Sequence, residues 1–192
     1  MRQNKRLMKN IVRAWQNTIT NHYQEHSINS ESGLQACFCA KLLEVFYEAN
    51  RSYKIFIEPQ VYGQDANEHI RPNIVISRRK QILVVIDLKY KPHARPNYSN
   101  NMQTLEWVLA HHSILSISNS HFLGVGKENN LYSLSDDVLL CWAGIYRGEQ
   151  VHIRDYASDN LCEHLLELHA LTSQGQHPII TSVPAIDEEE HL

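Results

Sequence analysis

Two charged side chains end the most apolar segment of the chain. The segment ILVVIDLKY spans residues 82–90, and its last part carries Asp87 and Lys89, two positions apart. Because side chains alternate along a strand, both would share one face with Leu83 and Val85, opposite a wholly apolar face. Burying such an ion pair at the end of a central strand is costly unless the charges are satisfied or used. An Asp-x-Lys pair is also common where a strand emerges into solvent. The neighbouring segments must therefore decide between a functional site and an ordinary exposed ion pair.

The neighbouring segments bring further polar residues toward the same place. RPNIVIS, which begins at Arg71, is joined to the strand of Asp87 by the short polar turn RRKQ, and this arrangement predicts a hairpin. Asn73 begins the first strand of this hairpin, so its side chain and that of Asp87 can converge near one end. Upstream, Glu31 opens a helix and Glu58 lies on the preceding strand. This pattern favours one polar site over an isolated surface pair.

The order of these elements resembles the PD-(D/E)XK nucleases. In that family a helix with a glutamate precedes a strand pair carrying P-D and then (D/E)-x-K, and the RecB-like branch adds Q-x-x-x-Y on the following helix. The matching positions are Glu31, Pro72 with Asn73, Asp87-Leu88-Lys89, and Gln103 with Trp107 in the place of the tyrosine. The resemblance covers about residues 30–126. The stretch RPNIVI…VVIDLKYK is also similar to nuclease subunits of modification-dependent restriction systems.

The resemblance implies a Mg²⁺ site, with Mn²⁺ as a substitute, that hydrolyses phosphodiester bonds of DNA. Lys89 would orient the attacking water and stabilise the developing charge, while Glu31 would act through water or at a second metal. The implied catalytic set is Glu31, Asn73, Asp87, Lys89 and Gln103, and the implied metal ligands are Asn73, Asp87, the carbonyl of Leu88, and Glu58.

One position departs from the family pattern, because Asn73 stands where the family has a metal-binding aspartate. An amide oxygen can ligate a hard cation, but it lacks the charge with which a second carboxylate holds Mg²⁺. Three interpretations stay open: an inactive relative, an enzyme that takes its second carboxylate from Glu58 or Glu31, or a chain altered to abolish cleavage. A nuclease-fold module that no longer cuts and instead binds nucleic acid or assembles with a partner is therefore the alternative function.

Hydrophobic periodicity predicts an α/β (α+β) fold, in which a mixed central sheet is flanked by helices. The resemblance implies that its core is restriction-endonuclease-like. Ser30 is a plausible N-cap for the second helix. Helices are expected over residues 3–22, 31–50, 102–112 and 157–171, and strands over 53–62, 71–77, 82–90, 120–126, 138–148 and 150–156. The expected organisation is a basic helical arm over residues 1–29, a nuclease-like core over 30–172 and a polar, acidic tail over 173–192.

The overall composition is that of an ordinary globular protein. The 192 residues carry a net charge of -3, so DNA binding requires a local basic face. Such charge is available close to the hairpin, from Arg71, Arg78, Arg79, Lys80, Lys91 and Arg95. Four cysteines without a C-x-x-C pair, no signal-peptide pattern and no apolar run of about 20 residues predict a cytoplasmic protein with no membrane contact. DNA is the expected partner, with RNA, a protein partner or a homodimer left open.

A second metal motif competes weakly with this interpretation. The segment from His22 to His26 reads H-x-x-E-H, the inverted zinc-peptidase pattern. It lies where the first helix is expected to end, and chance matches are expected in a chain with twelve histidines. A zinc protein built on these two residues is therefore a third, weaker hypothesis.

Overall fold

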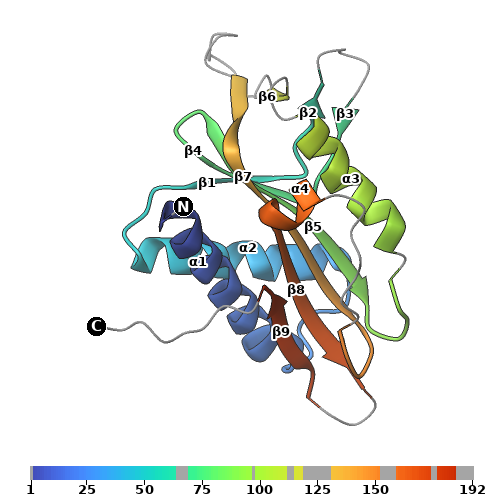
Figure 1. Cartoon of the computed structure of the whole chain (residues 1–192). Helices are drawn as coiled ribbons and strands as arrows, with labels where there is room; N and C mark the ends of the chain where they lie inside the picture. Colours follow the sequence, from blue (N-terminus) through green and yellow to red (C-terminus); the bar gives the residue numbers. More distant parts are fainter. Residues whose placement is uncertain are drawn as a thin grey trace.

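A mixed β-sheet with helices on both faces forms the centre of the molecule (Figure 1). The computed structural model describes residues 2–63, 69–96, 98–111, 115–118, 131–151, 159–173 and 177–184. The helical elements are α1 (Arg2–Thr18), the π-helical turn η1 (Ile19–Tyr23), α2 (Glu31–Glu48), α3 (Tyr98–Ala110) and α4 (Asp159–His164). The strands are β1 (Lys54–Ile57), β2 (Val61–Tyr62), β3 (His69–Ile70), β4 (Ile74–Arg78), β5 (Gln81–Lys91), β6 (Ser116–Ser118), β7 (Leu131–Arg147), β8 (Leu165–Thr172) and β9 (Ile179–Val183).

The long strands β5 and β7 organise the sheet, whose order runs β1-β4-β5-β7. β4 and β5 form the antiparallel hairpin that the sequence predicts, whereas β5 and β7 run parallel. The first part of β7 also pairs with β6, and its last part pairs with β8. The expected class, a mixed sheet flanked by helices, is confirmed, while the restriction-endonuclease-like core stays a prediction.

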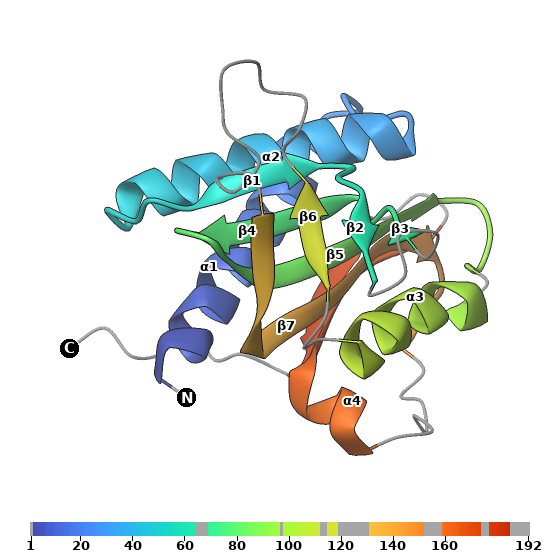
Figure 2. The same cartoon turned by 90° about the horizontal axis from the view of Figure 1, so that it is seen from above.

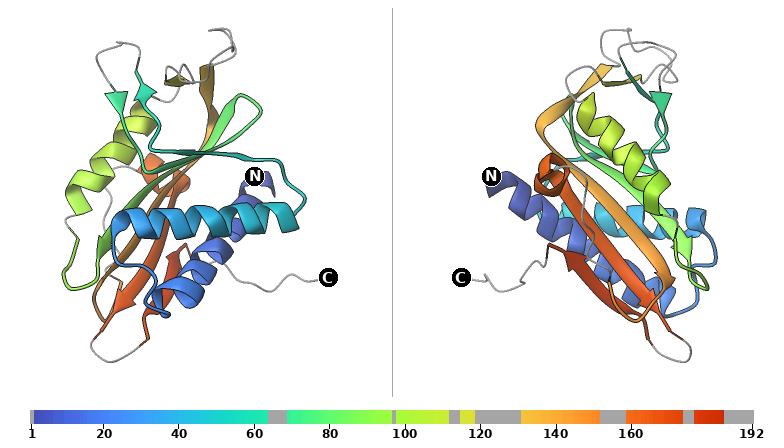
Figure 3. Two further views of the ribbon diagram at one scale, coloured as in Figure 1. Left: turned by 180° about the vertical axis from the view of Figure 1, so that it is seen from behind. Right: turned by 45° about the vertical axis from the view of Figure 1, so that its right-hand side comes forward.

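Two hydrophobic clusters form the core, one on each face of the sheet. α1 and α2 cover one face, and α3 and α4 lie on the other, as the view from above shows (Figure 2). The view from behind shows α1 and α2 crossing each other on their face of the sheet (Figure 3, left). Trp15 of α1 packs edge-on against Phe38 of α2, with ring centroids 5.4 Å apart. The helix expected in an N-terminal arm therefore belongs to the main core, with Arg13 bonded to Glu48 of α2 at 2.7 Å.

The start of α2 is set by its cap. Ser30 has extended backbone angles, and its hydroxyl accepts a hydrogen bond from the Gly33 N–H at 3.0 Å. The acidic residue Glu31 stands in the first turn, where the helix dipole favours a negative charge. The buried face of α2 includes Leu34, Phe38, Leu42 and Val45. The expected N-cap is confirmed, and it places Glu31 at the end of the helix that lies beside β5.

A bulge in β5 changes the expected alternation of its side chains. The pairs Ile76↔Val84 and Ser77↔Ile82 leave Leu83 as an extra residue between them. The prediction that Leu83 shares a face with Val85 is therefore wrong, because Leu83 packs on the α1–α2 side and Val85 on the α3 side. From Val84 onward the strand alternates without further interruption.

The predicted helix over 157–171 is wrong, because among its described residues only Asp159–His164 is helical and Leu165–Thr172 forms the buried strand β8. Leucines at positions 161, 165, 168 and 171 fit a helical spacing, but a strand buried on both faces gives the same apolar run. β9, within the segment expected to be a tail, pairs antiparallel with β8.

The structure tests the other expected strands only in part. The strand expected over 53–62 is divided into β1 and β2 at Glu58 and Pro59, where Glu58 has a positive φ of 47°. The expected strand at 120–126 and all but the start of the one at 150–156 lie outside the described residues. Within the described part of the chain, no helix is both long enough and apolar enough to cross a membrane.

Candidate active site

Asp87 is the most deeply buried carboxylate of the expected set. Its side chain is 12% exposed, and its strand neighbour on β7 is the fully buried Trp142. Its Oδ2 atom is buried without a hydrogen-bond partner, and the nearest cation, Lys89 Nζ, lies 3.7 Å away. Burial raises the pKa of Asp87 to about 6, an effect that Lys89 opposes and Glu31 reinforces. The Oδ2 atom of Asp87 is thus shielded from water and accepts no hydrogen bond.

One edge of β5 is left without a strand partner beyond Ile74, the first residue of β4. The last pair of this hairpin is Ile74↔Ile86, so Leu88 and Tyr90 extend past the start of β4. The Leu88 N–H donates to the side-chain oxygen of Asn73 at 2.8 Å, and the Tyr90 N–H donates to Glu31 Oε2 at 3.4 Å. Side chains therefore replace the missing strand at this edge. The Leu88 carbonyl faces the same edge, because the N–H and C=O of one strand residue point to the same neighbour.

Asn73 is held in place through its backbone as well. Its carbonyl accepts hydrogen bonds from the side-chain amide of Gln35 and from the Glu58 N–H, each at 2.9 Å. The register of the hairpin, continued one step beyond Ile74↔Ile86, places Asn73 beside Asp87. The two residues are therefore neighbours at one end of the hairpin, while the convergence of their side chains on a common metal stays a prediction.

Lys89 lies between two carboxylates. Its ammonium is 3.7 Å from Asp87 Oδ2 and 4.0 Å from Glu31 Oε1, and its side chain is 24% exposed. Both separations exceed an ordinary hydrogen bond, so the single positive charge of Lys89 is shared between the two carboxylates. The site combines a buried carboxylate, a half-exposed carboxylate and one partly buried cation at the same strand edge.

Two expected members of the site are directed elsewhere. The carboxylate of Glu58 pairs with Arg71 at 3.2 Å, and only the Glu58 backbone contacts Asn73. Gln103 lies on the exposed side of α3 and, among the described contacts, makes no hydrogen bond to Asp87, Lys89 or Asn73. The structure therefore brings together Glu31, Asn73, Asp87, Leu88 and Lys89.

Sequence reasoning missed Gln35, which holds Asn73 from α2. It is 4% exposed and lies four residues after Glu31, one helical turn further along the same side. A glutamine within an otherwise apolar helix face, spaced i to i+4 from the expected glutamate, was the available signal.

A second polar group on the same side of the sheet was also missed. Asp87, Trp142 and Glu167 are direct neighbours across β5, β7 and β8. Glu167 Oε2 lies 2.9 Å from His169 Nε2, and His169 Nδ1 lies 2.9 Å from the Tyr146 hydroxyl. All these side chains are buried. The alternation of polar residues 167 and 169 with apolar neighbours was a period-two signal, hidden by the helical interpretation of 157–171.

The donor atoms suit a hard cation better than a soft one. The carboxylates of Asp87 and Glu31 and the carbonyl of Leu88 are oxygen ligands of the kind that Mg²⁺ and Mn²⁺ take. The Oδ2 atom of Asp87 has no hydrogen-bond partner, as expected of an oxygen that coordinates a cation. Asn73 fits less well, since its oxygen already accepts the Leu88 N–H. The residues thus match a Mg²⁺-type ion with fewer charges than a strong site requires.

The zinc hypothesis gains no support from the described residues. His26 has a positive φ of 59°, so the helix ends before it and the H-x-x-E-H segment is not one helical face. No group of three or more His, Cys, Asp or Glu side chains in the described part of the chain is placed to hold a metal. The same finding limits the Asp87 site to at most two carboxylates.

No protein-family model, curated protein or solved structure matches this chain.

Proposed function

We propose that this protein is a metal-dependent nuclease of the PD-(D/E)XK type that acts on DNA, with a reaction centre formed by Asp87, Lys89 and Glu31. The observation that carries the proposal is the buried, unpartnered Oδ2 of Asp87, 3.7 Å from Lys89 at an open strand edge. A solvent-exposed ion pair, the alternative explanation of the Asp-x-Lys motif, would not leave a carboxylate oxygen in this state.

Each residue of the site would have its own role in phosphodiester hydrolysis. When bound, Mg²⁺ would supply charge that stabilises the transition state of phosphodiester hydrolysis. Asp87 would hold it, with the Leu88 carbonyl at the same edge. Lys89 would position a water molecule and stabilise the charge that develops on the phosphate oxygens. Glu31, which is half exposed, would reach the solvent side of the site and accept a proton or a second ion through water.

Asn73 sets the expected level of activity. Its side-chain oxygen is bonded to the Leu88 N–H and carries no charge, so it adds little to cation binding. We therefore expect the chain to bind Mg²⁺ weakly and to cleave DNA slowly. The Asn73→Asp variant would provide a second carboxylate beside Asp87.

The experiment compares the chain with two variants on supercoiled plasmid DNA, with Mg²⁺, with Mn²⁺ and with EDTA. We expect Asn73→Asp to cleave faster than the chain as given, and Asn73→Asp combined with Lys89→Met to lose cleavage while still binding the ion in calorimetry. If Asn73→Asp binds Mg²⁺ but does not cut DNA or RNA, the nuclease proposal is wrong.

The hydrogen bond between Asn73 and Leu88 specifically favours a second candidate function, a nuclease-fold module that binds nucleic acid or a protein partner without cutting. An asparagine satisfied in this way completes the strand edge as a structural residue. DNA binding that is equal with Mg²⁺ and with EDTA, without cleavage by Asn73→Asp, would support this function. Restriction or defence is the setting that the resemblance suggests for either function, and the cysteine pattern favours the cytoplasm.

A further inference from the structure

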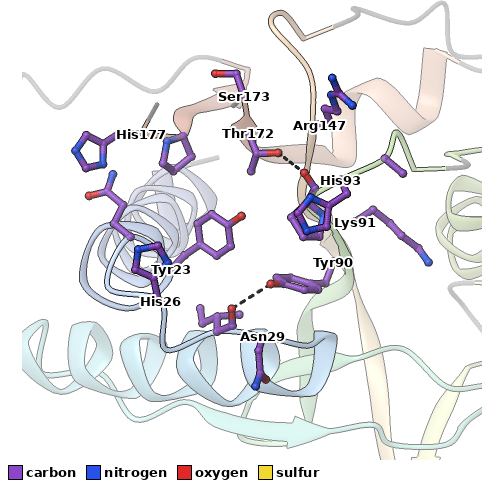
Figure 4. A pocket seen from close by; sticks show the side chains of 15 residues that line it. Tyr23, His26, Asn29, Tyr90, Lys91, His93, Arg147, Thr172, Ser173 and His177 are labelled. Carbon is purple, nitrogen blue, oxygen red and sulfur yellow. Dashed lines mark hydrogen bonds between the residues drawn. The ribbon is translucent and has the colours of Figure 1, made fainter. Parts of the chain in front are cut away.

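A cavity of about 1300 Å³ opens at the ends of β5, β7 and β8, and the segment after η1 lines one side of it (Figure 4). The rings of Tyr23 and Tyr90 and the imidazole of His93 are directed toward its interior, and Arg147 stands at its rim. His26 and His177 lie on the same side as Tyr23, across the cavity from His93 and Arg147. The cavity is therefore lined by aromatic rings and nitrogen donors from four separate segments.

The lining carries positive charge without any acid. Fifteen described residues line the cavity, and none of them is aspartate or glutamate. Arg147 and Lys91 are the permanent cations, although the Lys91 side chain extends away from the interior. His93, His26 and His177 add ring nitrogens that can donate hydrogen bonds. In a chain with more acidic than basic residues, such a lining selects for an anion.

The two tyrosines give the cavity a fixed aromatic wall. The Tyr90 hydroxyl donates to the Ile28 carbonyl at 3.0 Å, and the ring of Tyr23 stands edge-on to that of Tyr90, with centroids 6.3 Å apart. The Thr172 hydroxyl donates to the Pro92 carbonyl at 2.6 Å and ties the opposite side. Burial raises the pKa of both tyrosines, so their hydroxyls stay neutral beside an anion. The wall is thus ordered before any ligand arrives.

The size of the cavity argues for more than a simple anion. Sites for small organic ligands typically enclose about 300–1,000 Å³. A phosphate ion would leave most of this space empty, whereas a phosphate joined to a sugar and a planar base would reach both the nitrogen donors and the tyrosine rings. Aromatic side chains commonly bind bases by stacking on their faces.

The cavity is distinct from the Asp87 site. Tyr90 follows Lys89 on β5, and their side chains lie on opposite faces of the strand. Glu31 Oε2, which accepts the Tyr90 N–H, marks the boundary between the two places.

We infer that this cavity binds a nucleoside phosphate, with the phosphate toward Arg147 and His93 and the base against Tyr23 and Tyr90. The inference does not rest on the proposed nuclease function, because neither Asp87 nor a metal takes part. The nucleoside phosphate can be a free nucleotide or the terminal nucleotide of a strand, since both present the same groups.

The test is isothermal calorimetry of the full chain with dAMP in EDTA, alongside deoxyadenosine and inorganic phosphate. We expect dAMP to bind more tightly than either part. Arg147→Gln combined with His93→Gln should weaken dAMP binding by about tenfold or more, the change that one lost charge-assisted hydrogen bond produces. Both side chains are exposed, so the fold should persist. The matched control is Arg79→Gln with His69→Gln, which removes the same groups from exposed positions outside the cavity.

A second variant tests the aromatic wall. Tyr23→Phe should retain dAMP binding and Tyr23→Leu should weaken it, because stacking needs the ring and not the hydroxyl. The inference is overturned if dAMP does not bind, if the paired variant matches its control, or if phosphate alone binds as tightly as dAMP. Competition by a 5′-phosphorylated oligonucleotide, but not by its unphosphorylated form, would identify a strand end as the source. Absence of competition beside dAMP binding would identify a free nucleotide.

Discussion

The side-chain oxygen of Asn73 accepts a hydrogen bond from the Leu88 N–H at 2.8 Å, and this bond joins the two strands where their ladder ends. Asparagine thus has a structural task at the position where a metal-binding aspartate is expected. The two roles are compatible, since an aspartate could accept the same N–H with one oxygen and turn the other toward a cation. The remaining amide group of asparagine is a donor and would face a cation unfavourably.

The first prediction separates these two roles by stability. Asn73→Leu should lower the free energy of unfolding by about 1–3 kcal/mol, because the N–H of the buried Leu88 loses its acceptor. Asn73→Asp should change it little at neutral pH without metal and should raise it when Mg²⁺ is added. Urea titrations with and without Mg²⁺ measure both effects. Equal stability of the leucine variant would show that the bond contributes nothing.

The second prediction concerns the charge on Asp87. Its pKa rises from an ordinary value of 3.8 to about 6 in the folded chain, so the folded state favours the protonated carboxyl. Its contribution to folding is therefore present below about pH 4 and is lost as the pH rises to about 6. Asp87→Asn should stabilise the protein at pH 7–8 by up to roughly 3 kcal/mol, and less at pH 5. Denaturant titrations at several pH values test this, with the exposed Asp136→Asn as control. A destabilised Asp87→Asn at pH 8 would contradict it.

The third prediction concerns Gly144, over which the indole of Trp142 is folded. A Cβ at position 144 would lie 2.3 Å from the Cη2 atom of Trp142, a fully buried side chain that has no room to move. Gly144→Ala should cost about 1–3 kcal/mol or more through overpacking. At Gly148 the nearest contact of a Cβ is an ordinary 3.5 Å, so Gly148→Ala is the matched control. Similar melting temperatures for the two variants would show that the indole can shift freely.

The fourth prediction compares two glutamines. Gln35→Met should lower stability by about 1 kcal/mol, because the Asn73 carbonyl keeps its bond to the Glu58 N–H but loses the one from Gln35. Gln103→Met, on the exposed side of α3, should leave stability unchanged. Cleavage assays on the same variants in the Asn73→Asp background would also test the expected role of Gln103. A fall in cleavage for Gln103→Met alone would place it in the reaction after all.

The fifth prediction concerns the basic surface of α1. Leu7, Ile11 and Trp15 are buried, so Lys5, Arg6 and Lys9 point outward. If these three contact phosphates, changing them together to Gln should reduce the slope of log affinity for DNA against log salt by roughly one unit per lost contact. Affinity measured across a salt series decides this. An unchanged slope would leave α1 with its packing role alone.

The predictable part of the site is the part that is local in sequence. Asn73 and Asp87 lie on one hairpin with a short turn, so the sequence could place them near the same end of it. Their pairing also depends on the bulge at Leu83, because the register at the turn, Arg78↔Gln81, would set Asn73 opposite Ile86. Glu31 could be placed at the start of α2 because its cap, Ser30, is readable from residue type. Its contact with Tyr90 required the packing of α2 on the sheet and was not readable in that way.

The parts that sequence reasoning missed depend on the tertiary fold. The leucine spacing of 161–171 fits a helix and a doubly buried strand equally well, and only the pairing of β8 with β7 decides between them. The bulge at Leu83 has no residue signature, since it arises from how β5 meets two partners at once. The contact of Gln35 with the Asn73 carbonyl likewise exists only once α2 and the hairpin are docked.

The parallel pairing of β5 with β7 has a consequence for how the chain folds. The hairpin of β4 and β5 closes over a turn of a few residues, whereas pairing Ile82 with Leu134 must close a loop of about fifty residues. Loop closure loses entropy before any contact repays it, so non-local parallel strands form slowly. Asn73 and Asp87 should therefore meet early during folding, in a hairpin that still exposes one apolar edge. Until β7 docks, that edge can pair with another chain, so refolding yield should fall as protein concentration rises.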